Sequence, residues 1–227
     1  MRSPEPAKSA PARKRIVIVD DHAVLREGLL TKINREPDLV VCGEAGSANE
    51  AMAAVERLRP DLMLVDINLP GRNGLELVRD LRALRPDLPV LVLSMHDETV
   101  FAERALRAGA RGYVSKQQSG SDLIVAIRQV LSGEIHLSAS TSTRLLGGLT
   151  GSQRQTDSPS PMGLLTDREL EVFTMIGEAR ETKEISKSLG MSTKTVEAHR
   201  ASIKRKLQLK TGPELTRHAV LWVEAMG

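Results

Sequence analysis

A repeated alternation of short apolar runs with helical patterns is the feature that most constrains this chain. The runs cover residues 16–19, 39–43, 62–67, 90–94 and 112–115. Their continuous apolar character is typical of strands that are buried on both faces, as in a parallel sheet. The segments between them, such as 48–58 and 75–84, carry apolar residues at three- and four-residue spacing, which indicates amphipathic helices. The pattern predicts an α/β fold with a five-stranded, doubly wound parallel sheet.

The composition of the 227-residue chain suits a soluble protein of one large or two ordinary domains. Hydrophobic residues make up 41% and charged residues 27% of the chain, and no apolar run approaches the ~18 residues of a membrane span. We therefore expect no membrane partner. The single Cys42 cannot form an internal disulfide, which fits a reducing compartment, and we expect a cytoplasmic location.

A change of composition divides the chain after the β/α pattern. Residues 138–163 are rich in Ser, Thr, Gly and Pro, and they are predicted to form a mostly flexible linker with one helical turn near 144–149. We predict a disordered tail at 1–14, a first domain at 15–137 and an all-helical second domain at 164–227. The helical patterns of the second domain cover residues 167–176, 182–189, 193–207 and 213–224.

Acidic residues follow two of the predicted strands at the point where each strand ends. Asp20 and Asp21 close the first strand, and Asp66 closes the third. In the strand order 2-1-3-4-5 the first and third strands are neighbours, and ligands bind outside the carboxyl ends of such strands. We therefore expect the three carboxylates to converge. Ser94 and Lys116 end the fourth and fifth strands and should lie at the same edge.

These residue types in one place predict phosphoryl chemistry. Clustered carboxylates repel one another and need a cation, and hard oxygen ligands at an open site suit Mg²⁺. Asp66 would then be a nucleophile placed to accept a phosphoryl group. Lys116 would neutralise charge on the transferring oxygens, and the Ser94 hydroxyl would donate to one of them. Taken alone, the Asp20–Asp21 pair could instead serve only as a cap for the following helix.

Four sequence motifs together resemble the receiver domain of two-component response regulators. They are VDDH (19–22), DINLPGRNG (66–74), LS (93–94) and GYVSK (112–116). The resemblance covers about residues 16–136 and implies a flavodoxin-like fold with Asp66 as the phosphoacceptor. It also implies that Mg²⁺ is bound directly by Asp66 and Asp21, through water by Asp20, and by the backbone carbonyl of Asn68.

The same resemblance assigns residues around the phosphoryl group. It implies that Ser94 and Lys116 contact this group and that Tyr113 is the aromatic switch residue; by the residues alone, Tyr113 could equally be a half-buried strand aromatic. Two positions depart from the family pattern. Lys116 is followed by Gln117 in place of the common cis proline, and a non-proline cis bond costs ~3–4 kcal/mol, so the conformation of that loop is left open. Asn68 replaces an apolar residue, which could change how long the phosphoryl group survives.

A helix, a tight turn and a second helix are predicted at about 182–201. Gly190 follows the first helix as a C-terminal stop, and Ser192 is a fitting N-cap for the next. From Lys183 to Arg217 there are nine basic and three acidic residues, a net charge of +6 against +3 for the whole chain. A basic helix-turn-helix is typical of DNA binding, although charge alone would also suit a solvated helix face.

The segments LTDRELEVF (165–173) and EISKSLGMSTKTVEAHRASIKRKL (184–207) resemble the LuxR-type helix-turn-helix of NarL/FixJ-type response regulators. Ser186 in place of Ala, and KTGPEL at 210–215 in place of a more basic pattern, leave the motif intact. The resemblance implies that residues 193–206 form a recognition helix in the major groove. Eight residues of this helix are implied in DNA contact: Lys194, Thr195, Glu197, Ala198, Arg200, Ala201, Lys204 and Arg205. Of these, Glu197, Ala198 and Ala201 are placed to read bases.

The two resemblances together imply a non-enzymatic response regulator. A sensor histidine kinase would phosphorylate Asp66 and thereby change sequence-specific binding to double-stranded promoter DNA, and hence transcription. The phosphorylated form would be a homodimer; apolar surface on residues 213–224 is a candidate dimer contact, although simple core packing would explain it equally well. Two alternatives remain open from the residues. One is a Mg²⁺-dependent phosphohydrolase, although Asn68 stands where such enzymes carry a general acid. The other is a protein-interaction module that does not bind DNA.

Overall fold

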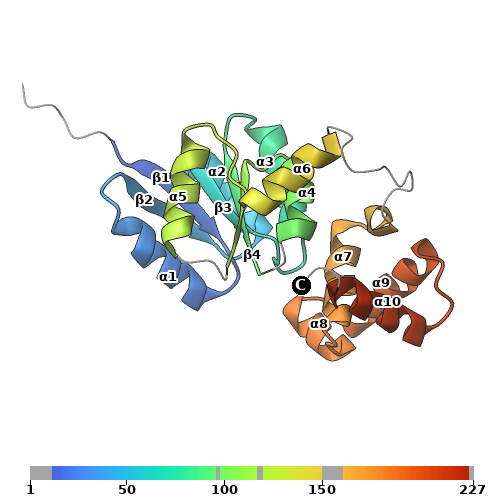
Figure 1. The fold of residues 1–227 in the computed structure, drawn as a ribbon. Coiled ribbons are helices and arrows are strands. Elements are labelled where there is room, and N and C mark those ends of the chain that lie inside the picture. The colour runs from blue at the N-terminus through green and yellow to red at the C-terminus, as the bar shows by residue number, and fades with distance from the viewer. Residues whose placement is uncertain (1–11, 96–97, 117–119, 150–160, 225–227) are drawn as a thin grey trace, which may run out of the picture.

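The computed structural model of this chain describes residues 12–95, 98–116, 120–149 and 161–224 (Figure 1). Most of the tail predicted at 1–14, the middle of the predicted linker, and the peptide bond between Lys116 and Gln117 lie outside the described residues. Within the described residues, no helix is both long enough and apolar enough to span a membrane.

Five parallel strands form one sheet in the order β2-β1-β3-β4-β5, which confirms the predicted topology. The strands are β1 (Lys14–Val19), β2 (Leu39–Ala45), β3 (Leu62–Asp66), β4 (Val90–Ser94) and β5 (Gly112–Ser115). β1 and β3 are neighbours in the sheet, and Val19 lies beside Val65. The residues that follow these two strands therefore meet at the same edge of the sheet.

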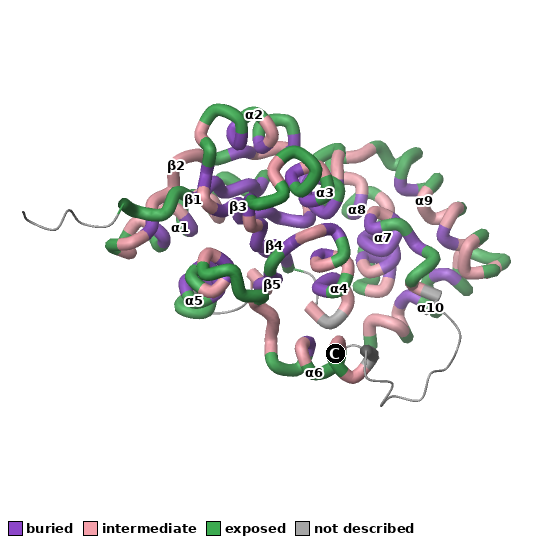
Figure 2. The backbone as a smooth tube through the Cα atoms, turned by 90° about the horizontal axis from the view of Figure 1, so that it is seen from above, coloured by how far each residue is buried: buried purple, intermediate pink, exposed green. Residues whose placement is uncertain are grey.

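Helices cover both faces of the sheet (Figure 2). Five helices make these two layers: α1 (Ala23–Asn34) and α5 (Gly120–Leu131) on one face, and α2 (Ala48–Leu58), α3 (Gly74–Leu84) and α4 (Glu98–Ala108) on the other. Along β1, Ile16 and Ile18 pack into the core under α1 and α5, whereas Val17 and Val19 pack into the core under α2, α3 and α4. Because both faces are buried, the strands appear in the sequence as unbroken apolar runs.

The C-terminal domain is all helical, as predicted. Its helices are α7 (Asp167–Gly177), α8 (Thr182–Ser188), α9 (Thr193–Lys206) and α10 (Gly212–Glu224). A capping box starts α7: the Thr166 hydroxyl accepts a hydrogen bond from the Glu169 backbone, and the Glu169 carboxylate accepts one from the Thr166 backbone. The rings of Phe173 and Trp222, whose centroids are 5.5 Å apart, join α7 to α10 in the core.

The described parts of the segment between the two domains form helices that its composition does not indicate. A three-turn helix, α6 (Ala139–Leu149), replaces the single turn predicted near 144–149, and a short 3₁₀ helix, η1 (Pro161–Leu164), precedes α7. The Ser138 hydroxyl accepts a hydrogen bond from the Thr141 backbone at 3.2 Å, and the Ser138 backbone donates to Glu98 at 2.7 Å. These local bonds cap the helix and anchor it to α4, which a Ser- and Thr-rich composition does not reveal.

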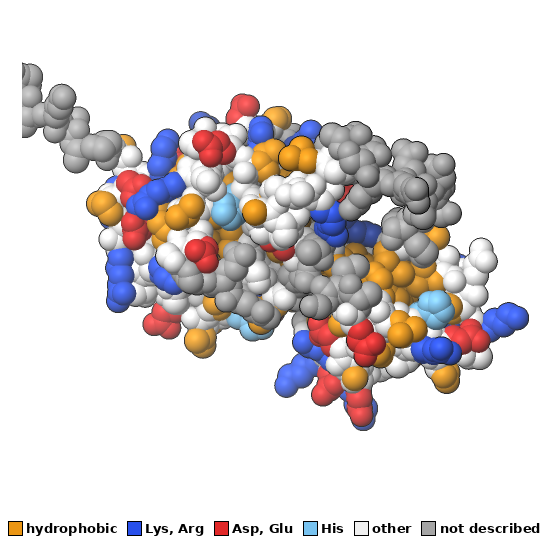
Figure 3. All heavy atoms as spheres, in the orientation of Figure 1, with side chains coloured by type: hydrophobic (Ala, Val, Ile, Leu, Met, Phe, Trp, Pro, Cys, Tyr) orange, Lys and Arg blue, Asp and Glu red, His pale blue; other side chains and the backbone are white. Residues whose placement is uncertain are grey.

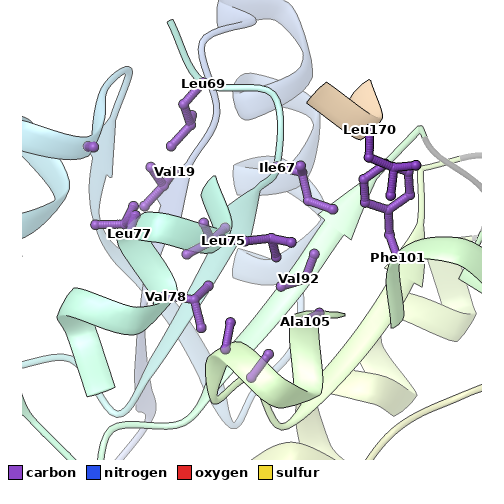
Figure 4. Packing of buried hydrophobic residues seen from close by; sticks show 14 of the residues in the cluster. Val19, Ile67, Leu69, Leu75, Leu77, Val78, Val92, Phe101, Ala105 and Leu170 are labelled. Carbon is purple, nitrogen blue, oxygen red and sulfur yellow. The ribbon is translucent and has the colours of Figure 1, made fainter. Parts of the chain in front are cut away.

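The C-terminal domain packs against the β/α domain through α7. One buried apolar cluster runs from α3 and α4 into α7, and Figure 4 shows Leu170 of α7 beside Phe101 of α4. Both residues are almost fully buried. The helical pattern of α7 predicts an apolar face but not this partner, because the same face could have packed entirely within its own domain.

Candidate functional site

The structure brings the three predicted carboxylates together at the edge of the sheet. Asp20 and Asp21 follow β1, and Asp66 is the last residue of β3. One side-chain ligand atom from each of them, and one from His22, all lie within 4.8 Å of one another. Asp20 and Asp66 are buried, whereas Asp21 and His22 are exposed. The cluster therefore has a closed inner side and an open outer side.

His22 is a member of this cluster that the residue pattern did not single out. Its Nδ1 atom lies 2.7 Å from Asp21 Oδ1 and 3.2 Å from Asp20 Oδ1. The His22 backbone also donates a hydrogen bond to Asp20 Oδ1 at 2.8 Å, and His22 is the N-cap residue of α1. The carboxylate of Asp20 thus orders the start of α1 and takes part in the cluster. The position of His22 directly after the acidic pair was the available signal.

Lys116 enters the cluster from the end of β5. Its Nζ atom lies 2.7 Å from Asp66 Oδ2 and 2.7 Å from Asp20 Oδ2. Burial raises the pKa of Asp66, the Lys116 ammonium opposes this, and the negative charge of Asp20 adds to the rise, so that the pKa lies at about 6. Burial lowers the pKa of Lys116, but the two carboxylates outweigh this effect and leave it raised. Lys116 is therefore a fixed positive charge in the site.

A divalent cation fits the donor atoms of this pocket. Asp66 Oδ1 is buried and has no hydrogen-bond partner among the described residues. Asp20 Oδ2, by contrast, is paired with the ammonium of Lys116 at 2.7 Å. Buried carboxylate oxygens without partners are costly, and carboxylates are the ligands that hard cations prefer. The acidic pocket of Asp20, Asp21 and Asp66 is thus consistent with a divalent cation site.

The other predicted residues of the site lie on β4, on β5 and in the loop that follows Asp66. Ser94 is fully buried at the end of β4, and its carbonyl accepts a hydrogen bond from the Lys116 backbone at 2.8 Å. Tyr113 is only 1% exposed, so its ring is already inside in this structure. The backbone N–H of Asn68 donates a hydrogen bond to the Asp66 carboxylate and lowers its pKa. The main chain of Asn68 therefore lies close to the acceptor.

The loop from Asp66 to α3 closes tightly on itself. The Gly74 backbone donates to the Ile67 carbonyl at 2.7 Å, and the Asn73 side chain caps α3 by accepting a hydrogen bond from the Leu75 backbone at 2.7 Å. A Cβ atom on Gly74 would lie 2.0 Å from the Asp66 carbonyl oxygen, so only glycine fits there. This explains the final Asn-Gly of the DINLPGRNG motif: the loop returns to the residue from which it starts.

The helix-turn-helix presents most of its predicted contact residues to solvent. Ser192 caps α9 by accepting a hydrogen bond from the Thr195 backbone at 3.1 Å, as its position predicted. Val196 and Ile203 are buried on the inner face of α9. Two of the predicted DNA-contact residues, Arg200 and Lys204, are half-buried. The other six are exposed: Lys194, Thr195, Glu197, Ala198, Ala201 and Arg205. Glu197 also accepts a hydrogen bond from the Thr182 hydroxyl at 2.9 Å and so links α9 to α8.

Comparison with known proteins matches both parts of this architecture. Residues 16–128 match the family described as response regulator receiver domain, and residues 163–219 match the bacterial regulatory proteins of the luxR family. The oxygen regulatory protein NreC of Staphylococcus epidermidis is 36% identical over 211 residues, which cover 91% of this chain and 96% of that protein. This chain belongs to the two-component response regulators with a LuxR-type output domain. NreC of Staphylococcus aureus strain JH9 is 35% identical over 209 residues.

Solved structures agree with this membership. A LuxR-family two-component response regulator from Aurantimonas sp. SI85-9A1 superposes with a TM-score of 0.57 and 34% identity, over 61% of this chain and 99% of that one. RcsB from Salmonella enterica serovar Typhimurium, bound to promoter rprA in the presence of the phosphomimetic BeF3−, shares the fold at a TM-score of 0.60 and 22% identity over 92% of this chain. The protein is thus a transcription regulator of the non-enzymatic response regulator family.

Proposed function

We propose that this response regulator accepts a phosphoryl group on Asp66 from a sensor histidine kinase. The observation that carries the proposal is Asp66 Oδ1, a buried carboxylate oxygen without a hydrogen-bond partner among the described residues, inside a cluster of carboxylates and one ammonium. An oxygen that is buried but not hydrogen-bonded keeps its lone pairs available for attack. Mg²⁺ would be held by Asp21 and Asp66 directly, by Asp20 through water, and by the backbone carbonyl of Asn68.

The residues of the site have separate roles in the proposed transfer. A carboxylate oxygen of Asp66 attacks the phosphorus of the kinase phosphohistidine, and the P–N bond breaks with its electron pair returning to the imidazole. Lys116 neutralises charge on the phosphoryl oxygens, and Ser94 donates a hydrogen bond to one of them. Tyr113 follows the movement of Ser94 as the switch residue. Mg²⁺ supplies charge neutralisation at the phosphoryl oxygens when it is bound.

We further propose a division of the chain in which residues 15–137 form the receiver domain, 138–163 the linker and 164–227 the DNA-binding domain. The α9 helix enters the major groove, where its exposed alanines and Glu197 read bases and its cations contact phosphates. Binding as a homodimer agrees with the exposed Leu221 on α10, and Figure 3 shows apolar side chains at the surface of the C-terminal domain. Related RcsB dimers have been seen bound to DNA.

In this structure the turn before α9 lies against the phosphoacceptor loop. A Cβ atom on Gly190 would lie 3.1 Å from Cβ of Pro70, which is four residues after Asp66. The turn that leads into the recognition helix is therefore in contact with the loop that follows Asp66. We propose that phosphorylation favours a state in which the two domains separate at this contact and the protein dimerises on DNA.

Intact mass spectrometry tests the proposal. The full chain is incubated with MgCl₂ and phosphoramidate, and wild type is compared with Asp66→Ala and with Asp61→Asn as a matched acidic control before β3. A single phosphoryl adduct on wild type and Asp61→Asn, absent from Asp66→Ala, is expected. An unmodified wild type, or an adduct on Asp66→Ala, would show that Asp66 is not the acceptor.

A further inference from the structure

The recognition helix α9 carries one acidic residue, Glu197, on its exposed side. Five other residues of α9 are Lys or Arg, so this carboxylate stands in a basic surface. The Glu197 side chain is 60% exposed, and its ion pair with Arg200 is long, at 3.8 Å between Arg200 Nε and Glu197 Oε1. An ion pair this long and this exposed contributes little to stability. The carboxylate is therefore available to a partner outside the protein.

A hydroxyl from the neighbouring helix fixes the direction of the Glu197 side chain. Thr182, the first residue of α8, donates a hydrogen bond from its hydroxyl to Glu197 Oε1 at 2.9 Å. The two helices are packed through the buried side chains of Ile185 and Val196, so this hydroxyl has a fixed position relative to α9. Both contacts of Glu197 use Oε1, and its Oε2 accepts no hydrogen bond from the described residues.

An ionised carboxylate can only accept hydrogen bonds, which restricts the bases that Glu197 can recognise. In the major groove two base groups donate: the N4 amino group of cytosine and the N6 amino group of adenine. Adenine also presents the acceptor N7 beside its amino group, and a carboxylate is repelled by that lone pair, whereas cytosine presents no acceptor there. Guanine and thymine present acceptors alone on this edge. Cytosine is therefore the base that best fits Oε2.

The other exposed base readers of α9 cannot make this distinction. Ala198 and Ala201 end in methyl groups, which can touch a thymine methyl but cannot hydrogen-bond. Of these three residues, Glu197 alone can distinguish bases by hydrogen bonding. Repulsion adds to its discrimination, because a carboxylate near phosphates and base acceptors weakens binding to any duplex that offers no donor at that position.

We propose that Glu197 selects a cytosine in the bound DNA by accepting a hydrogen bond from its N4 amino group, and that the Thr182 hydroxyl positions the carboxylate for this contact. The inference rests on the proposed reading of DNA by α9. Thr182 is a positioning residue, since it acts on the base through Glu197. Holding the carboxylate in place before DNA binds reduces the entropy that is lost when this side chain is immobilised at the interface.

Selection from a library of duplexes with a randomised central segment tests the choice of base. The full chain is treated with MgCl₂ and phosphoramidate, and wild type is compared with Glu197→Gln and Glu197→Ala. We expect a position that is cytosine for wild type and adenine for Glu197→Gln, because a glutamine amide pairs with N6 and N7 of adenine. Glu197→Ala should lose the preference at this position. Glu178→Gln, which removes an exposed acid just after α7, should select the wild-type sequence.

Titrations onto a selected duplex, and onto the same duplex with that C·G pair changed to T·A, measure the discrimination as a ratio of two affinities. We expect a ratio of about tenfold for wild type and about one for Glu197→Ala. Thr182→Val removes the hydroxyl and keeps the shape, and it should lower the ratio by about threefold, while Thr182→Ser should restore it. Because a loss of folded protein lowers both affinities equally, the ratio separates positioning from folding.

Thr174→Val is the matched control for Thr182→Val, because the Thr174 hydroxyl bonds to the Leu170 carbonyl within α7. This variant should keep the wild-type ratio. The same selected sequence for wild type and Glu197→Gln, or a wild-type sequence without the cytosine, would overturn the inference and leave DNA binding intact. A wild-type ratio for Thr182→Val would overturn the role of Thr182. No enriched sequence for wild type would overturn the proposed reading of DNA by α9 itself.

Discussion

The ammonium of Lys116 lies 2.7 Å from the carboxylate of Asp66, and both side chains are at most 5% exposed. Asp66 is at the end of β3 and Lys116 follows β5, so the pair spans the sheet across β4. A buried carboxylate beside a second carboxylate would be costly without this cation. The pair therefore allows an ionisable acceptor to stay inside the domain, and it makes the stability of the receiver depend on the residues of its own site.

Replacing Lys116 with Met should reduce both stability and phosphorylation. Removing one partner of a buried ion pair leaves uncompensated charge, and we expect the free energy of unfolding at pH 8 in EDTA to fall by about 3 kcal/mol. Loss of one preorganised positive charge at the transferring group should slow adduct formation on Asp66 by about 100-fold. Urea denaturation and intact-mass time courses measure the two effects. The exposed Lys183→Met should leave both unchanged; a similar loss there would argue against a specific role for Lys116.

Mg²⁺ should stabilise the folded protein through the acidic pocket. A ligand that binds only the native state at 100 times its Kd raises the unfolding free energy by about 3 kcal/mol. We expect MgCl₂ to raise the midpoint temperature of thermal unfolding of wild type, and EDTA to restore the value without Mg²⁺. Asp21→Asn should lose most of this shift, because Asp21 is a proposed direct ligand of the ion and the exposed one of the three carboxylates. Asp61→Asn, outside the cluster, should keep it, and equal shifts in the two variants would contradict this assignment.

The stability of the docked chain should depend on the protonation of Glu171. Because burial raises its pKa to about 7 from the ordinary 4.5, the folded protein holds a proton that the unfolded chain has lost between these values. Wild-type stability should therefore fall as pH rises through this window, and the full penalty is present above about pH 7. The difference in unfolding free energy between Glu171→Gln and wild type should therefore increase by about 2 kcal/mol, in favour of the variant, as pH rises from 5 to 8.

Denaturation curves at pH 5, 6, 7 and 8 measure this dependence. The exposed Glu178 provides the control, because Glu178→Gln should follow the wild-type curve over the whole range. Parallel curves for wild type and Glu171→Gln would show that Glu171 keeps an ordinary pKa in the folded protein.

Glu169 should show the opposite dependence on pH. Burial raises its pKa, but hydrogen bonds from Lys206, Ser202 and the Thr166 backbone together outweigh this effect and lower it to about 2. The ionised form contributes stability above about pH 4.5, and this contribution is lost as pH falls toward 2. Glu169→Gln should destabilise the protein by roughly 1–3 kcal/mol at pH 7, and its difference from wild type should shrink below pH 4. A constant difference across this range would contradict the assignment.

Lys194→Ala should weaken DNA binding without changing sequence preference. Lys194 is exposed at the start of α9, where a cation would contact phosphate. Removing one phosphate contact should lower the slope of log affinity against log salt by about 1. Titrations of the phosphorylated protein onto two unrelated duplexes at several salt concentrations measure this slope. Lys32→Ala on α1 serves as the control with an equal change in net charge, and the same loss of slope there would point to a non-specific effect.

Local chemistry in the sequence was sufficient for most of the architecture. Unbroken apolar runs predicted five strands, because a sheet covered on both faces has no polar side, and the strand order placed Asp20, Asp21 and Asp66 at one edge. Ser192 and Gly190 marked the turn before α9. The predictions were less accurate where they were based on composition alone, because composition does not show specific contacts. A Ser- and Thr-rich segment was predicted to be mostly flexible, but hydrogen bonds from Ser138 to Glu98 and Thr141 order the helix α6.

The sequence by itself determined which acidic residues close the strands and which residues cap the helices, since these features depend on neighbours along the chain. Only the tertiary structure decided which surfaces of the two domains meet. Asp167 belongs to a helix whose pattern predicts a start and an apolar face, yet its partners Arg79 and Arg104 are 88 and 63 residues away in sequence. These contacts depend on the free energy of packing one folded domain against the other, and a local sequence pattern does not contain that information.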